Sequence, residues 1–160
     1  MRVGERIHAI RVAAMERAPL GVKSGNRVVG VCGFEPPGGA TMSPEQQRQM
    51  LTVLAQAGPD VLGKAQEMLT EFGKHAPGQR HWKLGPVAVA PHLQGSGIGS
   101  RMVEQFCARM DALGDLACLD TDQVKNVRLY EKFGFEVVDE AAVLGVPMWF
   151  MTRPAVRQGE

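Results

Sequence analysis

The sequence has almost no net charge, little cysteine and no long apolar run. Its 18 lysines and arginines nearly balance 17 aspartates and glutamates, and the formal net charge at pH 7 is +1. The basic residues are scattered, so the positive patch that nucleic-acid binding requires is missing. No apolar run approaches the roughly 20 residues that span a bilayer, and the first residues lack the apolar segment of a secretion signal. We therefore expect a cytoplasmic protein that binds neither nucleic acid nor membranes.

The few cysteines are placed in a way that argues against two common uses. Cys32, Cys107 and Cys118 are odd in number, lie far apart in the sequence, and each sit in an apolar stretch. A disulfide framework or a zinc site needs cysteines, or cysteines and histidines, at characteristic spacing. The pattern predicts buried free thiols and no metal site.

Length and composition suit one soluble domain over residues 1–160. Apolar residues make up 44% of the chain and charged residues 22%, which is close to the average of globular proteins and argues against disorder. A chain of this length buries about two-thirds of its unfolded surface. It is therefore long enough to fold, alone or as an oligomer.

The start of the chain changes from a helical to an extended pattern. Apolar residues recur at helical spacing over residues 3–17, up to Pro19 and Gly21, which predicts an N-terminal amphipathic helix. Residues 26–34 are rich in β-branched and apolar types and follow Gly25, which predicts the first strand. We expect the helix to cover the sheet that contains this strand.

A helical hairpin is predicted between this strand and the next one. Ser43 is a favourable N-cap, followed by a proline and an acid in the first turn of a helix over residues 44–57. The segment Gly-Pro-Asp at residues 58–60 breaks this helix and starts another over about residues 60–73. Residues 43–75 therefore form an insertion between two strands.

The pattern of the remaining chain is that of alternating strands and helices. We expect strands over residues 81–89, 116–121, 134–138 and 147–152, and helices over about 97–113 and from Asn126, as its N-cap, to about Phe133. A Gly-Pro pair interrupts the first of these strands and predicts a bend. The strand–helix–strand units predict neighbouring parallel strands, and the last two strands an antiparallel hairpin. The predicted fold is α/β, with a mixed sheet flanked by helices.

A glycine-rich turn connects the bent strand to the helix after it. In Gln94-Gly95-Ser96-Gly97-Ile98-Gly99 the glycines let successive N–H groups point into one concavity, and the helix N-terminus adds roughly half a positive charge. Such a turn suits a diphosphate, although tight turns also use glycine for steric reasons alone. The spacing differs from the dinucleotide-binding Gly-x-Gly-x-x-Gly, and no Gly-Lys-Ser or Gly-Lys-Thr follows as in nucleotide hydrolases.

Two motifs, taken together, resemble the GNAT acetyltransferase family. The first is LGPVAVAPHLQGSGIG at residues 84–99, and the second is NVRLYEKFGF at residues 126–135. The resemblance covers about residues 26–153. It implies the GNAT acyl-CoA N-acyltransferase fold, with a CoA-binding core over residues 81–138 and the hairpin over 43–75 as an insertion. It also implies acetyl-CoA as cosubstrate and a small-molecule or peptide amine as acceptor.

The resemblance gives each matching position an expected role. The backbone of Val87, Ala88 and Val89 would pair with the pantetheine arm as an added strand does. Asn126 would hydrogen-bond the pantetheine, and the hydroxyl of Tyr130 would point at the thioester sulfur. From the residues alone, Asn126 is also a plain helix cap and Tyr130 a core aromatic. The diphosphate would be held by the N–H groups of Gln94, Gly95, Ser96, Gly97, Ile98, Gly99 and Ser100.

Acyl transfer to an amine also needs catalytic groups. Only about one alkyl amine in two thousand is neutral at pH 7, so a base is expected. Asp120 is the first candidate, because an acid at the matching place faces the site in similar enzymes, although it equally suits a loop-capping role. His81 and Glu35 are alternatives, and His92 is expected to be a solvated loop residue. Tyr130 would donate to the leaving sulfur or relay the amine's proton, and a peptide N–H at the strand break, taken to be that of Val89, would bind the oxyanion.

The N-terminal part departs from the family pattern. Members of the family begin with a strand and two helices that line the acceptor pocket, whereas this chain offers one helix before its first predicted strand. Either the start is shortened relative to the family or a partner subunit completes the sheet and the pocket, and of these we expect a homodimer. Two rival functions stay open at this point: a non-catalytic CoA-binding or regulatory module, and a nucleotide-binding protein.

Overall fold

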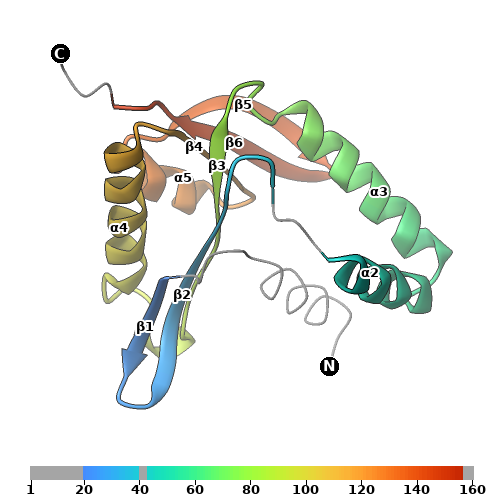
Figure 1. Ribbon diagram of the computed structural model, residues 1–160, viewed down its shortest axis with the longest axis horizontal. Helices are drawn as coiled ribbons and strands as arrows, with labels where there is room; N and C mark the ends of the chain where they lie inside the picture. Colours follow the sequence, from blue (N-terminus) through green and yellow to red (C-terminus); the bar gives the residue numbers. More distant parts are fainter. Residues whose placement is uncertain (1–19, 40–42, 157–160) are drawn as a thin grey trace.

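The computed structural model describes residues 20–39 and 43–156. The helix expected over residues 3–17 lies outside the described residues. Within these residues, six strands form one mixed sheet in the order β1-β2-β3-β4-β6-β5, in which β3 and β4 are the only neighbouring strands that run parallel (Figure 1). The strands are β1 (Leu20–Ser24), β2 (Arg27–Glu35), β3 (His81–Val89), β4 (Leu116–Thr121), β5 (Glu136–Val143) and β6 (Val146–Arg153). The mixed α/β sheet flanked by helices is confirmed.

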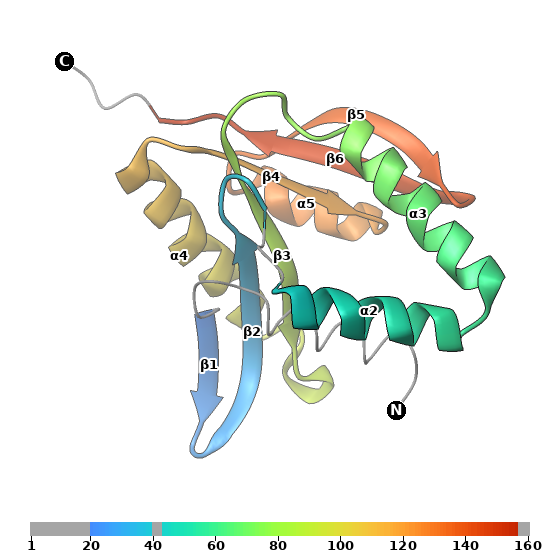
Figure 2. The ribbon, with the colours of Figure 1, turned by 45° about the vertical axis from the view of Figure 1, so that its right-hand side comes forward.

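The described helices cover opposite faces of this sheet. They are α2 (Pro44–Gln56), α3 (Pro59–Lys74), α4 (Ile98–Leu113) and α5 (Val124–Glu131), with a short 3-10 turn, η1 (Pro91–Leu93). Helices α4 and α5 lie on one side, and the α2–α3 hairpin lies on the other (Figures 1 and 2). None of the described helices combines the length and apolar content that a bilayer span needs.

The hydrophobic core lies between the sheet and α4 and α5. Phe34 of β2 packs on Phe106 of α4, with ring centroids 5.7 Å apart, and on Trp82 of β3, at 6.0 Å. Side chains alternate between the faces of a strand, so Lys83, next to Trp82, points to the opposite face. There it lies over the ring of Phe72 of α3, 5.1 Å from its centroid. The face that carries Lys83 is therefore the one that the inserted hairpin covers.

One strand is missing from the sequence prediction. Residues 20–24 form β1, which pairs antiparallel with β2 through a turn at Gly25, where φ is 58°. The prediction that residues 26–34 form the first strand is therefore wrong, because β1 precedes it. Only Leu20 and Val22 are apolar in this five-residue edge strand, and an alternation that short is no signal on its own. Its pairing with β2 is a tertiary effect.

The inserted hairpin is confirmed, and its first helix is capped as expected. The N–H of Gln46 donates to the Ser43 hydroxyl at 3.2 Å, and the Ser43 N–H donates back to the Gln46 side-chain oxygen at 2.8 Å. This reciprocal capping box satisfies two N–H groups that a helix end leaves without partners. The second helix starts at Pro59 after Gly58, where φ is 109°.

Two details of the C-terminal half differ from the prediction. Asn126 is not the N-cap of α5, because Gln123 holds that position and accepts the N–H of Asn126 at 2.8 Å. Strand β5 is also not the parallel neighbour of β4, because β6 lies between them. The turn at Leu144 and Gly145, both with positive φ, suits a tight two-residue hairpin. It folds β6 back along β5 and into the position beside β4.

Candidate active site

Strands β3 and β4 separate partway along the sheet. They pair only from His81–Lys83 to Leu116–Cys118. Beyond this point Gly85 has a φ of 137°, and Pro86 has no N–H to donate. On the β2 side, the pairs Phe34–Leu84 and Cys32–Val87 leave one extra residue in β3, which is a bulge. The predicted bend is therefore present, and it opens a gap between two neighbouring parallel strands.

The edge of β3 that faces this gap carries backbone groups able to pair with a ligand. The N–H of Ala90 donates to the carbonyl of Val29 at 2.8 Å, so it points toward β2. In an antiparallel pair, alternate residues turn their N–H and C=O to the same neighbour. Those of Val87 and Val89 therefore point away from β2, into the gap, whereas Ala88 bonds β2. Within the described residues, this stretch of β3 has no strand partner on the β4 side.

The glycine-rich turn ends this open edge. Gly95 and Gly97 have φ values of 82° and 84°, and a Cβ built on either would meet no heavy atom within 4 Å. Gly97 is the N-cap of α4, so the N–H groups of Ile98, Gly99 and Ser100 belong to the first helical turn and have no acceptor inside the helix. Open space, first-turn N–H groups and a helix N-terminus fit a diphosphate.

Gln94 and Ser96 form hydrogen bonds that fix the shape of the turn. The N–H of Gln94 donates to the Pro91 carbonyl, and that of Ser96 to the Leu93 carbonyl, both at 3.3 Å. The Ser96 hydroxyl adds a bond of 2.6 Å to the same Leu93 carbonyl, and the Gln94 amide bonds the Val89 carbonyl at 3.3 Å. The N–H groups of Gln94 and Ser96 are thus already bonded within the loop, although both lie in the stretch from Gln94 to Ser100 that was predicted to bind the diphosphate.

Tyr130 lies on the core side of the sheet, in α5. Its side chain is 9% exposed and packs edge-on against Phe135, with ring centroids 5.9 Å apart. Burial, and then the nearby Cys32 and Asp120, raise the pKa of Tyr130 to about 12. The phenol therefore stays protonated at neutral pH and is a hydrogen-bond donor.

Asn126 lies one helical turn before Tyr130. Residues four apart lie on the same side of a helix, so the two side chains share a face of α5. The Asn126 amide donates to the hydroxyl of Thr121, at the end of β4, at 3.3 Å. Asn126 therefore lies beside the end of β4, and Tyr130 follows it on the same face of α5.

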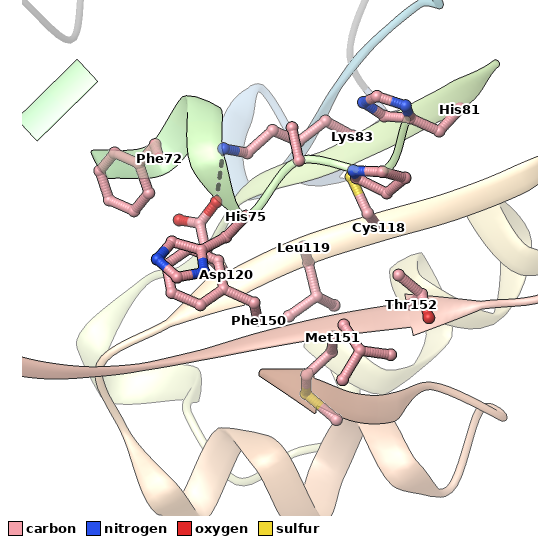
Figure 3. A pocket seen from close by; sticks show the side chains of 13 residues that line it. Phe72, His75, His81, Lys83, Cys118, Leu119, Asp120, Phe150, Met151 and Thr152 are labelled. Atoms are coloured by element: carbon pink, nitrogen blue, oxygen red, sulfur yellow. Dashed lines mark ion pairs between the residues drawn. The ribbon is translucent and has the colours of Figure 1, made fainter. Parts of the chain in front are cut away.

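Asp120 has a partner that the sequence did not predict. It lies two residues beyond the last β3–β4 pair and forms an ion pair with the ammonium of Lys83, across the start of the gap (Figure 3). Lys83 in turn lies over the Phe72 ring, which is a cation–π contact. The carboxylate of Asp120 is therefore already paired with a cation and is not free to act as a base.

A pocket opens on this face, under the end of α3 (Figure 3). Polar side chains and two aromatic rings share its lining, and His81 is among them, its Nδ1 2.7 Å from the Gln79 carbonyl. Glu35 lies opposite Lys83 on β2 and does not line the pocket; His92 is exposed in η1. The polar and aromatic lining residues are Phe72, His75, His81, Lys83, Asp120, Phe150 and Thr152.

Sequence reasoning missed His75 and its neighbours. His75 follows α3 and stacks on Phe150 of β6, with ring centroids 4.1 Å apart and planes at 18°. Its Nδ1 is 2.7 Å from a carboxylate oxygen of Asp139 on β5. No local pattern links residues 75, 139 and 150, which only the folded sheet brings together.

The thiols behave as predicted. Cys32, Cys107 and Cys118 are buried and free. Burial is the main cause that raises the pKa of Cys32 to about 12, and those of Cys107 and Cys118 to about 11. No cluster of three or more potential metal ligands occurs among residues 20–39 and 43–156.

Known proteins share this sequence pattern and this fold. The sequence profile of the "Acetyltransferase (GNAT) family" matches residues 5–135. A Corynebacterium glutamicum protein of the class "histone acetyltransferase HPA2 and related acetyltransferase" superposes with a TM-score of 0.61 at 20% identity. That match covers 86% of this chain and 64% of the other, so this chain spans less than two-thirds of that protein's length.

Two further structures with the same fold are enzymes with named acceptors. The polyamine N-acetyltransferase of Drosophila melanogaster, which forms N-acetylagmatine, matches with a TM-score of 0.59 at 14% identity, over 84% of this chain and 73% of its own. The ribosomal-protein-S18-alanine N-acetyltransferase of Escherichia coli matches with a TM-score of 0.56 at 13% identity, over 92% and 76%. At such identities the likeness shows a shared fold.

Proposed function

We propose that this chain, which belongs to the GNAT acetyltransferase family, transfers the acetyl group of acetyl-CoA to a primary amine. The amine would attack the thioester directly, in a ternary complex. The observation that carries the proposal is the gap between β3 and β4. Its open β3 edge leads directly into the turn with Gly95 and Gly97. An extended arm and a diphosphate, joined as they are in coenzyme A, match these two features in the same order.

Binding would rest mainly on the backbone. The N–H and C=O groups of Val87 and Val89 at the open edge would pair with the amides of the pantetheine arm, as an added strand does, and Ala88 would keep this stretch of β3 fixed to β2. The first-turn N–H groups of α4 and the open space at Gly95 and Gly97 would receive the diphosphate. Asn126, beside the gap, would hydrogen-bond the arm.

Tyr130 would act as a hydrogen-bond donor to the leaving sulfur. With the pKa of Tyr130 at about 12 and that of an alkyl thiol near 8.5, full proton transfer from the phenol to the thiolate is uphill by roughly 5 kcal/mol. A hydrogen bond from the neutral phenol costs no such transfer, and it stabilises charge that develops on sulfur. Of the Val87 and Val89 N–H groups at the open edge, one would bind the oxyanion and the other would pair with the arm.

The acceptor would enter from the opposite face, through the pocket under α3. There the amine would lie beside the Lys83–Asp120 ion pair and the imidazole of His75. We propose a small-molecule or peptide amine, because the structural neighbours above act on a polyamine and on a protein alanine. A homodimer and a cytoplasmic location remain predictions; measurement of the mass in solution tests the dimer, and a monomer would refute it.

The test is acetyl transfer to a panel of amines that includes polyamines and short peptides with free N-termini. Thiol release measures turnover, and mass spectrometry identifies the acetylated product. Amine-dependent release with a matching product supports the proposal. Calorimetric binding of CoA without transfer to any amine would instead indicate a CoA-binding module, and binding of ATP in place of CoA would indicate a nucleotide-binding protein.

A further inference from the structure

A histidine is fixed between two aspartates on the acceptor face. His75 stacks on the Phe150 ring, and its side chain is only 14% exposed. The sheet register places Asp120 of β4 and Asp139 of β5 on either side of Phe150, because each of them is its pairing partner. A register shift between Val137 and Asp139 marks a bulge in β5 that brings Asp139 level with Phe150.

The two nitrogens of His75 have different surroundings. Nδ1 is bound to Asp139 at 2.7 Å. Within the part of the chain that the structure describes, Nε2 has no hydrogen-bond partner. His75 also lines the pocket, on the same side as the Asp120 carboxylate and the Lys83 ammonium (Figure 3). One nitrogen is therefore held by a carboxylate, and the other is available to a molecule in the pocket.

We propose that His75, oriented by Asp139, is the general base that takes the proton from the acceptor amine; this inference rests on the proposed acetyl transfer. Asp139 acts on the amine only through the imidazole and is a positioning residue. Its hydrogen bond from His75, followed by that from the Glu140 N–H, lowers the pKa of Asp139. The carboxylate thus stays ionised and fixes the proton of the neutral imidazole on Nδ1, which leaves Nε2 as the acceptor.

His75 suits the task better than Asp120. An aspartate lies about six pH units below an alkyl ammonium in ordinary pKa and a histidine about four, so the transfer to histidine is less uphill. Asp120 is also already paired with Lys83. The titratable and charged groups that share the pocket or a bond with the imidazole are Lys83 and His81 of β3, Asp120 of β4 and Asp139 of β5. Glu71 and Lys74, in the last turn of α3, form an ion pair with each other.

The proton balance is complete with these residues. The ammonium of the acceptor gives one proton to Nε2 of His75, and the neutral nitrogen then forms the C–N bond to the thioester carbon. The C–S bond breaks, the second proton of the nitrogen ends on the sulfur, and the imidazolium later releases its proton to water. The products are the amide, the free thiol and one proton.

The experiment compares His75→Gln and Asp139→Asn with the matched control His92→Gln, whose imidazole is exposed in η1. We expect His75→Gln to lower kcat/KM for the amine at pH 7 at least 100-fold and to abolish the acidic limb of the pH–rate profile. CoA affinity should be unchanged. Asp139→Asn should lower kcat with little change in KM, and His92→Gln should keep the acidic limb. Imidazole added to His75→Ala should restore part of the rate.

The outcomes separate the two proposals. If the unsubstituted enzyme transfers acetyl groups and His75→Gln stays within twofold of it, with the acidic limb intact, this inference is overturned and the proposed function stands. If the unsubstituted protein acetylates no amine, the proposed function and this inference are both refuted. Asp139→Asn covers the case in which His75→Gln fails to fold, because it leaves the stacked ring in place: an unchanged kcat there also overturns the inference.

Discussion

Replacement of Gly97 by alanine tests whether the glycine turn holds a ligand or only makes a turn. Gly97 has a φ of 84° as the N-cap of α4, and a Cβ there would meet open space within the protein. In the left-handed region an alanine costs about 1–2 kcal/mol. For a chain of this size that lowers Tm by about 2–8 °C. This loss is expected whether or not a ligand binds.

The other end of α4 offers a matched control. Gly114 caps the helix C-terminus with a φ of 64°, and a Cβ there also meets no atom within 4 Å. Gly114→Ala should cost similar stability at a site far along the helix from the turn. Only Gly97→Ala places a methyl group in the space proposed for the diphosphate.

The two variants should therefore agree in stability and differ in binding. Displacing the diphosphate from one N–H removes a hydrogen bond to a charged group, worth about 1.5–3 kcal/mol, so the Kd for CoA should rise about 10- to 100-fold in Gly97→Ala alone. Thermal melts followed by circular dichroism give the stability, and calorimetry gives the Kd. Equal Kd values in both variants, at equal loss of Tm, would refute the placement of the diphosphate.

Three other predictions follow from the buried or bonded ionisable groups. Tyr130→Phe should lower kcat about 100- to 1000-fold with CoA affinity kept. Since the pKa of Tyr130 is about 12, the unsubstituted enzyme should show no loss of rate from this group below about pH 10. A loss of rate there that the variant lacks would contradict the assignment. The three buried cysteines, whose raised pKa values disfavour the thiolate, should not react with a thiol reagent in the native protein and should react after denaturation. Rapid labelling of the native protein would show that the reagent reaches the core. Asp115 accepts the Trp82 indole N–H at 2.8 Å, and this bond, followed by that from Arg80, lowers the pKa of Asp115. The stability that results is present above the pKa of the unfolded chain, near 3.9, and is lost as pH falls through the lower pKa of the folded protein. Denaturant titrations should therefore show Asp115→Asn less stable than the unsubstituted protein at pH 7, with a difference that narrows below pH 4. A difference in stability that does not change with pH would disprove the linkage.

The inserted hairpin supplies part of the pocket under α3. Phe72 and His75 reach the sheet from the end of the inserted hairpin, where they contact Phe150 and, through Phe72, Lys83. The insertion thus lines the pocket proposed for the acceptor and is more than an external brace. Replacing the hairpin would change the pocket proposed for the acceptor, whereas the turn proposed to bind CoA lies outside the hairpin.

The sequence alone was sufficient for the parts that depend on local chemistry. Ser43 and the Gly58-Pro59 break delimit the two inserted helices, Gly85-Pro86 forces the bend in β3, and Gly95 with Gly97 makes the turn. Proline without an N–H, glycine at positive φ and a serine N-cap act within a few residues of themselves. Their effects could therefore be predicted from the printed chain.

The tertiary structure decided what depends on contacts between distant segments. Strand β1 exists because it pairs with β2, and β5 lies at the edge because β6 folds back beside β4. Lys83 meets Asp120 only across the start of the gap, and His75 meets Asp139 across 64 positions of the chain. Pairing and stacking across such separations depend on the sheet register, and no spacing in the sequence encodes that register.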